Sequence, residues 1–358
     1  MKKPLDYAVW AVETMMRKFK AEELPPARRL HYHQGVFLTG VKLTAELVKE
    51  KEQEYKQYVR DYIDSCIDEK GDFISCDLTQ FDDMEPGVHI FPIYEETKDE
   101  KYKRLLDILM DAVKKYPRIP TGGFYHKYRC PSQMWLDGLY MAGPLCCMYA
   151  KYFNEPEWFD DTYKQITLMK QYTRDDKTGL WYHAYDDSRQ AAWADEKTGC
   201  SPEFWGRSIG WVPMAILDDL EYIPEDYPHR QEIIDIVVDL IKAICNYQSE
   251  SGMWYQVVDK ADNEDNWPES SCTCLYVAAI SRAIKLGLLS EDYAQYAKKG
   301  YEAVINSLTA NGDDLIIGNI CVGTGVGDYT HYINRPTSEN DLHGAGAFLI
   351  MCTYYSKL

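Results

Sequence analysis

Apolar residues recur at helical spacing through most of this chain, and runs that alternate between apolar and polar residues are few. This periodicity predicts an all-α fold, because it places one apolar stripe along each helix. The expected helices cover residues 5–20, 34–50, 53–68, 84–97, 100–115, 133–153, 156–172, 207–221, 230–249, 271–287, 291–309 and 340–356. The pattern therefore predicts about twelve helices.

A glycine followed by aromatic or aliphatic residues recurs after several of these segments. The clearest copies are EKGDFIS at 69–75, TGGFYHKY at 121–128, KTGLWYHAY at 177–185 and ESGMWYQVV at 250–258, with a weaker copy, NGDDLIIGN, at 311–319. Glycine allows a left-handed or tight turn after a helix, and the aromatic pair could then line a common face. The intervals fit one helical hairpin plus its loops, repeated along the chain.

Twelve helices in repeated hairpins can close into a double ring, with six inner and six outer helices. An open helical solenoid is the alternative, but it needs repeats of similar length and polar terminal caps. Here the repeat lengths vary, and the last expected helix contains the apolar run GAGAFLIMCTYY at 344–355. We therefore expect an (α/α)6 toroid. Because no Pro-, Ser- or Gly-rich linker divides the chain, residues 1–358 are expected to form a single domain.

Composition excludes several classes of protein. The chain has 39 Lys and Arg against 57 Asp and Glu, a formal net charge of −18. Since phosphate backbones and anionic membranes repel such a chain, neither nucleic acid nor a membrane is an expected partner. No run of 18 apolar residues occurs, and Asp6, Glu13 and Arg17 interrupt any signal-like segment. The eleven scattered cysteines indicate reduced thiols, and we expect a cytoplasmic protein that is a monomer or a weak homo-oligomer.

Asp137 is the first candidate for chemistry. It lies in MWLDGLYMAG, where apolar and aromatic residues surround it. A carboxylate in such a setting is either paired or has a pKa raised by desolvation, and a raised pKa suits a general acid. The alternative is that Asp137 satisfies backbone groups beside Gly138.

A second acidic pair occurs in QFDDMEPGVHIF. Asp82 or Asp83 is placed to cap the following helix, with Glu85 and Pro86 in its first turn. Capping is compatible with a functional role, because a capping residue at the mouth of a loop also faces a site. The sequence leaves open which of the two carboxylates faces a ligand.

The segment SPEFWGRSIGWVPMAI offers a cation between aromatic residues. Trp205 and Trp211 flank Arg207 at the start of a helix, which suits recognition of a carboxylate on a sugar ring. A structural Arg–Trp stack is equally consistent with this pattern. His126 and His183 occupy equivalent positions in successive glycine–aromatic loops, so both are candidates for binding residues at the rim of the same site.

Known cofactor motifs do not appear in the chain, and we expect no metal or organic cofactor. Cys272 and Cys274 lack the spacing of a zinc site. The segment GTGVG at 323–327 lacks the Lys-Ser/Thr ending of a phosphate loop.

Seven segments resemble the unsaturated rhamnogalacturonyl hydrolases of glycoside hydrolase family 105, which are relatives of the unsaturated glucuronyl hydrolases of family 88. The segments are HYHQGVFLTG (31–40), DDMEPGVHIFPIYEETKDEKYK (82–103), MWLDGLYMAGP (134–144), GLWYHAY (179–185), WGRSIGWVPMA (205–215), WPESSCTCLYVAAI (267–280) and NDLHGAGAFLI (340–350). They follow one another in the same order over nearly the whole chain. The resemblance implies an (α/α)6 fold and a glycoside hydrolase.

The resemblance also implies a substrate and a reaction. The substrate would be a rhamnogalacturonan-derived oligosaccharide that ends in 4,5-unsaturated galacturonic acid. An acid would protonate C4 of the vinyl ether and water would add at C5, after which the hemiketal opens and releases the partner sugar. Such a reaction needs one acid/base group rather than the two carboxylates that flank an ordinary scissile bond.

Residue by residue, the resemblance makes Asp137 the general acid/base and Asp82 the second catalytic carboxylate. It implies that Arg207 pairs with the substrate carboxylate and that Trp205 and Trp211 stack on the sugar ring. The remaining matches to substrate-binding positions are His183, His126, Lys127, Tyr32, Gly35 and Val36.

Three other functions remain as alternatives. A family 88 enzyme would act on unsaturated glucuronyl residues from glycosaminoglycans, and a sugar epimerase would use a pair of histidine bases. A non-catalytic carbohydrate-binding toroid would not depend on Asp137.

Overall fold

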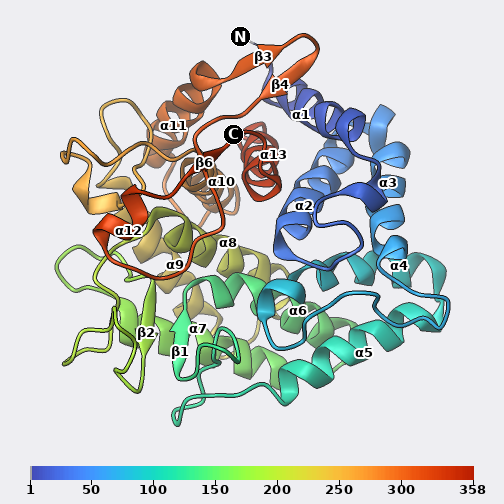
Figure 1. The fold of residues 1–358 in the computed structure, drawn as a ribbon, viewed down its shortest axis with the longest axis horizontal. Coiled ribbons are helices and arrows are strands. Elements are labelled where there is room, and N and C mark those ends of the chain that lie inside the picture. The colour runs from blue at the N-terminus through green and yellow to red at the C-terminus, as the bar shows by residue number, and fades with distance from the viewer. Residues whose placement is uncertain (1) are drawn as a thin grey trace.

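The computed structural model describes residues 2–358, which form thirteen α-helices and three two-stranded sheets. An inner set of helices, linked by mutual packing, forms a ring. In chain order they are α2 (Tyr32–Leu47), α4 (Ile90–Thr97) with the 3₁₀ segment Glu85–His89 before it, α6 (Asp137–Phe153), α8 (Gly206–Tyr222), α10 (Ser270–Lys285) and α13 (Leu342–Tyr355). Figure 1 shows α2, α6, α8, α10 and α13 toward the middle of the molecule. Because α13 packs against both α10 and α2, the inner ring is closed.

A second set of helices packs outside this ring. It consists of α1 (Pro4–Lys18), α3 (Glu52–Ser65), α5 (Glu100–Lys114), α7 (Glu157–Thr173), α9 (Arg230–Cys245) and α11 (Ala294–Ser307). Figure 1 shows α1, α3, α5 and α11 at the periphery. The inner helices α10 and α13 are buried on nearly all sides, whereas the outer helix α5 has one buried stripe. The prediction of an all-α (α/α)6 toroid is confirmed.

The glycine–aromatic loops form a repeated turn. Gly71, Gly179 and Gly252 have φ angles of 80°, 74° and 93°, in the left-handed region that glycine tolerates. In the second copy this conformation belongs to Gly122 rather than to Gly123. Three of the loops close with an antiparallel bridge across the turn, at Ile67–Phe73, Arg118–Phe124 and Arg174–Trp181. The first aromatic residue of three copies, Phe124, Trp181 and Trp254, is buried in the core, whereas the tyrosine that follows each of them is half-buried.

Several boundaries differ from the expected ones. The segment expected as the start of a helix at 133 is instead strand β1 (Gln133–Trp135), which pairs with β2 (Ala184–Asp186). The pairing with a distant strand outweighs the local helical pattern, and the helix begins only at Asp137. The short helix α12 (Tyr329–Ile333) was not expected. The other strands are β3 (Thr309–Asn311), β4 (Asp314–Ile316), β5 (Ile320–Cys321) and β6 (Thr337–Ser338).

The cysteines behave as the scattered pattern predicts. All eleven are free among the residues that the structure describes, and nine of them are buried.

None of the helices formed by residues 2–358 has the length and apolar run needed to cross a bilayer.

Candidate active site

Several candidate residues lie in the first turns of the inner helices, at one end of the ring. Tyr32 begins α2, Asp137 begins α6, and Arg207 is the second residue of α8. The Tyr32 ring lies 6.1 Å from that of His343, in the first turn of α13, which shows that these helices begin side by side. Helix N-termini carry partial positive charge, so this end can attract an anion in a chain that is acidic overall.

Asp137 is held by a histidine from the third glycine–aromatic loop. His183 Nε2 lies 3.1 Å from Asp137 Oδ2, and His183 Nδ1 lies 2.7 Å from the Tyr332 hydroxyl on α12. The backbone N–H of Gly327 donates to the same hydroxyl oxygen at 3.2 Å. His183 is fully buried, while the Asp137 side chain retains 14% exposure. Asp137 is therefore paired, the first of the two states that its surroundings allow.

The hydrogen bonds determine the tautomer of His183. An ionised Asp137 carboxylate can only accept, so His183 Nε2 carries the ring proton and donates it to Asp137. The neutral ring then accepts at Nδ1 from the Tyr332 hydroxyl, which stays protonated because burial raises the pKa of Tyr332. Burial lowers the pKa of His183, which favours this neutral form. Burial also raises the pKa of Asp137, but the hydrogen bond and electrostatic interaction with His183, together with His126, outweigh it and leave that pKa below its ordinary value.

Asp82 lies in a different electrostatic setting from Asp137. Its carboxylate is buried, accepts a short hydrogen bond from Lys127 Nζ, and lies 3.3 Å from His126 Nε2. Burial raises the pKa of Asp82, but His126 and Lys127 outweigh it and hold that pKa well below its usual range. Asp82 is therefore an ionised carboxylate whose negative charge is balanced by its neighbours, and it is poorly suited to donating a proton.

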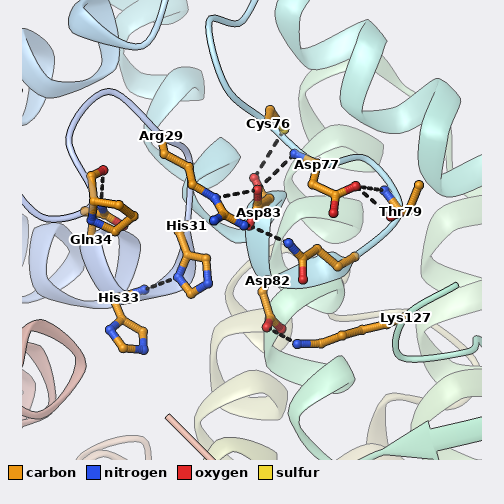
Figure 2. Close-up of polar contacts among 12 residues, drawn as sticks. Arg29, His31, His33, Gln34, Cys76, Asp77, Thr79, Asp82, Asp83 and Lys127 are labelled. Carbon is orange, nitrogen blue, oxygen red and sulfur yellow. Dashed lines mark hydrogen bonds and ion pairs between the residues drawn. The ribbon is translucent and has the colours of Figure 1, made fainter. Parts of the chain in front are cut away.

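Asp83 points away from this cluster and supports the loop. It accepts two hydrogen bonds from Arg29, at 3.0 and 2.9 Å, one from the backbone N–H of Asp77 and one from Gln80. Figure 2 shows Asp82 directed at Lys127 and Asp83 directed at Arg29. Asp82 therefore faces the candidate site residues His126 and Lys127, whereas Asp83 does not.

Trp135 connects the two histidines that the loops present. His126 stacks on the Trp135 ring at 4.5 Å between centroids, and His183 meets the same ring edge-on at 5.5 Å. His126 Nδ1 is buried with no hydrogen-bond partner among residues 2–358, and it lies 3.6 Å from where a Cβ at Gly138 would stand. The equivalence of the two loops indicated this pairing, but Trp135 itself was not among the expected site residues.

Arg207 is buried, and the far end of the chain orients it. Its Nη1 donates to the Cys321 carbonyl at 2.7 Å and its Nη2 to the Val322 carbonyl at 2.9 Å. The guanidinium lies 4.5 Å from the Trp205 ring centroid, as the flanking pattern suggested. Two of its five N–H donors are thus occupied by carbonyls in the segment before α12.

The tryptophans expected to stack on a sugar are enclosed by protein. Trp205 stacks on Tyr332 and lies under the Arg207 guanidinium, while Trp211 stacks on Tyr140 at 4.8 Å. Both indole rings are 1% exposed. Neither offers a free face to a sugar ring, so their part in the site is to support Arg207, Tyr332 and Tyr140.

Gly35 and Val36 lie inside the ring rather than at its open end. A Cβ at Gly35 would stand 1.6 Å from Glu85 Oε2, and Val36 is fully buried where Gly346 of α13 approaches its backbone. The expectation that they bind the partner sugar is therefore corrected, because a helix turns successive side chains through its surface and only Tyr32 faces the site residues. Glycine at 35 makes room for the Glu85 carboxyl.

Glu85 provides a pH-dependent stability prediction. It is 2% exposed, and its Oε2 has no hydrogen-bond partner within the described part of the chain. Burial, with Asp218 and Asp82, holds the pKa of Glu85 well above its ordinary value. A carboxyl with a raised folded-state pKa stabilises the fold below its unfolded pKa, and this stability is lost as pH rises through the folded pKa.

Glu85→Gln removes the group whose ionisation destabilises the fold at high pH. The stability of the variant relative to the wild type should therefore increase as pH rises. We expect closely similar melting temperatures near pH 5 and a melting temperature about 2–4 °C higher for the variant at pH 8. Thermal unfolding followed by circular dichroism across this range checks it, with Glu96→Gln at an exposed position as the control. A constant difference between variant and wild type at every pH would contradict it.

Comparison with known proteins places this arrangement in a family. The Glycosyl Hydrolase Family 88 model matches residues 7–358. A solved glycoside hydrolase of family 105 from C. acetobutylicum ATCC 824 is 31% identical, covers 98% of this chain and 99% of its own, and superposes with a TM-score of 0.92.

Two curated relatives match about three fifths of the chain. "Unsaturated rhamnogalacturonyl hydrolase YesR" of Bacillus subtilis is 25% identical over 240 residues, which are 65% of this chain and 64% of that protein. An "Unsaturated 3S-rhamnoglycuronyl hydrolase" of Alteromonas sp. is 26% identical over 218 residues, which are 60% of this chain and 49% of that protein.

The family model spans almost the whole chain, and the 31% identical family 105 structure covers it from end to end. The resemblance seen in the sequence is therefore confirmed. The chain belongs to glycosyl hydrolase family 88, with close likeness to family 105, and it is a glycoside hydrolase.

Proposed function

We propose that this enzyme releases 4,5-unsaturated galacturonic acid from rhamnogalacturonan-derived oligosaccharides by acid-catalysed hydration of the ring double bond. Residues 1–358 would act as one catalytic domain. The observation that carries the proposal is the contrast between the two carboxylates. Asp137 is held by a neutral histidine and is partly exposed, whereas Asp82 is neutralised by Lys127.

This contrast argues against an ordinary glycosidase mechanism. That mechanism needs two carboxyl groups that act on opposite sides of a glycosidic bond, one of them protonated. The ion pairs of Asp82 favour its charged form and block its oxygens, so Asp137 is left as the single acid/base group. Hydration of a vinyl ether needs only one.

Asp137 would act twice. Its carboxylic acid gives a proton to C4, water oxygen bonds to C5, and the Asp137 carboxylate takes the proton that the water loses. The hemiketal at C5 then opens the ring, and C1 expels the partner sugar as its hemiacetal collapses. A bound uronate excludes water and adds negative charge beside Asp137, and both effects raise its pKa and supply the acid form.

The other residues would hold the sugar in place. Arg207 would pair with the uronate carboxylate through its remaining N–H groups, and the unpartnered His126 Nδ1 would hydrogen-bond a ring hydroxyl. Asp82 and Lys127 would orient water or hydroxyl groups, and Tyr32 would border the partner sugar. The half-buried Trp135 is a better platform for the ring than Trp205 or Trp211. His183 would act mainly through Asp137.

The relative named for 3S-rhamnoglycuronyl substrates supports a second candidate, removal of an unsaturated uronate from a different rhamnose-containing glycan. Cytoplasmic location and a monomeric or weakly associated state belong to the same proposal.

The proposal is tested by the loss of ultraviolet absorbance of the double bond. Unsaturated galacturonyl-rhamnose, an unsaturated rhamnoglycuronyl oligosaccharide and unsaturated chondroitin disaccharide are incubated with the enzyme at equal concentration. We expect the first to lose absorbance fastest. Faster loss with either of the others would reassign the substrate, and no loss with any of them in a folded sample would reject hydration.

Asp82 and Asp83 should respond differently to the same substitution. Asp83→Asn removes the charge that Arg29 pairs with, so it should lower the free energy of unfolding by about 2 kcal/mol while kcat stays within a factor of two or three of wild type. Asp82→Asn should lower kcat/KM about 100-fold by releasing Lys127 and His126 from position. Urea unfolding and steady-state kinetics on both variants measure this, and the reverse pattern would place Asp83 at the substrate.

A further inference from the structure

Two histidines and a carboxylate meet where α13 packs against α2. Asp341 immediately precedes α13, His343 is in its first turn, and His33 is in the first turn of α2. Asp341 Oδ1 lies 2.8 Å from His343 Nδ1 and 3.2 Å from His33 Nδ1. All three ligand atoms lie within 4.8 Å of one another.

The orientation of the His343 ring leaves a nitrogen lone pair facing the carboxylate. His343 Nε2 lies 3.1 Å from the Cys321 carbonyl, which can only accept, so Nε2 carries a proton. With Nε2 as the protonated nitrogen of a neutral ring, the Nδ1 lone pair faces a carboxylate oxygen at 2.8 Å, a repulsive contact that a cation between the two atoms would remove.

The geometry of the contact also differs from that of a hydrogen bond. Among residues 2–358, His343 Nδ1 has no hydrogen-bond partner although the carboxylate oxygen is 2.8 Å away. The oxygen therefore lies off the line along which a ring N–H would point. Two ligands of one metal ion, each bonded at about 2.0–2.2 Å, lie about 3 Å apart and off each other's axes in the same way.

Asp341 is turned toward the histidines instead of capping its helix. It occupies the N-cap position of α13, where an aspartate ordinarily accepts from the first backbone N–H groups, yet its side chain makes no cap hydrogen bond. His33 and Asp341 keep 22% and 17% side-chain exposure, so a hydrated ion can reach the cluster.

We propose that His33, Asp341 and His343 bind a divalent first-row transition-metal ion such as Zn²⁺ through two Nδ1 atoms and a carboxylate oxygen. Two imidazoles and one carboxylate are the donor set that such ions prefer, and water would complete the coordination. The bond from His343 Nε2–H to the Cys321 carbonyl is the outer-sphere contact that metal-binding histidines commonly make.

The proposed ion would also support the substrate-binding cation. The Cys321 carbonyl accepts from both His343 and Arg207, so fixing His343 fixes one of the two carbonyls that orient the guanidinium. The ion would lie on the Nδ1 side of the imidazole ring, with the ring between it and Arg207, and the Asp341 carboxylate offsets part of its charge. Sequence spacing did not indicate this site because its ligands come from opposite ends of the chain.

The test uses metal binding by the full chain and does not depend on its activity. Chelator-treated wild-type protein is titrated with ZnCl₂ by calorimetry, and its visible spectrum is followed with Co²⁺. We expect one ion per chain, with affinity lowered about 100-fold or more in His33→Ala and in Asp341→Asn. His229→Ala, which removes an exposed histidine paired with Glu232, should bind as the wild type does.

Two results would overturn the proposal. One is the absence of Zn²⁺ or Co²⁺ binding by the wild type at micromolar concentration, which would leave an imidazolium–carboxylate pair. The other is equal binding by wild type, His33→Ala and Asp341→Asn, which would assign the ion to other groups. Because His33 is partly exposed, its variant should fold even if substitution at the buried His343 prevents folding.

Discussion

Replacing Asp137 with Asn is expected to lower turnover of unsaturated galacturonyl-rhamnose by about 10³-fold or more. Asn cannot transfer a proton, and proton transfer by a positioned side chain contributes about 10²–10⁴-fold. The loss should lie near the upper end, because the same carboxyl both protonates C4 and takes the proton from water. The amide is the same size, and its oxygen can still accept the hydrogen bond from His183, so the fold and substrate affinity should remain.

Absorbance loss measures turnover, and calorimetry with the substrate measures binding by the inactive variant. Asp176→Asn, at a side chain that is 99% exposed, serves as the matched control and should keep wild-type activity. Turnover of Asp137→Asn within tenfold of wild type would show that another group supplies the proton. It would return Asp137 to a structural role at the start of α6.

The second large effect is expected at Arg207. Arg207→Met keeps much of the side-chain volume but removes the charge proposed to hold the substrate carboxylate. Losing one partner of a buried charge pair costs about 2–5 kcal/mol, so kcat/KM should fall by about 30- to 4,000-fold. Arg207→Lys should fall between wild type and Met, because it keeps the charge but not the fork that reaches two carbonyls and a ligand.

The methyl ester of the same substrate separates recognition of the carboxylate from general damage. The wild type should prefer the free acid to the ester by a factor close to the loss in Arg207→Met, and the variant should discriminate little between them. Arg174→Met, which removes a guanidinium paired with Asp239 and Asp176 away from the site, should behave as wild type. An unchanged preference for the acid in Arg207→Met would mean that another group reads the carboxylate.

The parts of the fold that were predicted correctly are those that depend on local pattern. The apolar periodicity located the twelve longer helical segments, and the glycine–aromatic repeat predicted the hairpins that close into a ring. Errors occurred where distant contacts compete with local pattern, as at residues 133–135, which pair with 184–186 across the site. Residues 85–89 likewise form a 3₁₀ segment, with Pro86 in its first turn, before α4 begins at Ile90.

The residues of the candidate site likewise fall into those that local sequence indicated and those that only distant contacts bring in. Asp137, His183, Arg207 and Asp82 stand in distinctive segments, and the structure brings them near one another. Their partners were not visible in the sequence, because Tyr332 and the Cys321 carbonyl lie more than a hundred residues from the groups that they orient. Gly35 and Val36 were assigned to the site because they lie in a segment that resembles the family. That segment covers both faces of its helix, and these two residues lie on the face that is turned into the ring.

The sequence by itself determined the helical class, the repeated hairpin, the negative net charge and the candidate site residues, because each of these depends on residue type and short-range spacing. Only the tertiary structure decided how readily each candidate carboxylate could exchange a proton. Burial, the neighbouring cations and the tautomer of His183 set that property, and all three depend on segments that meet only when the ring closes.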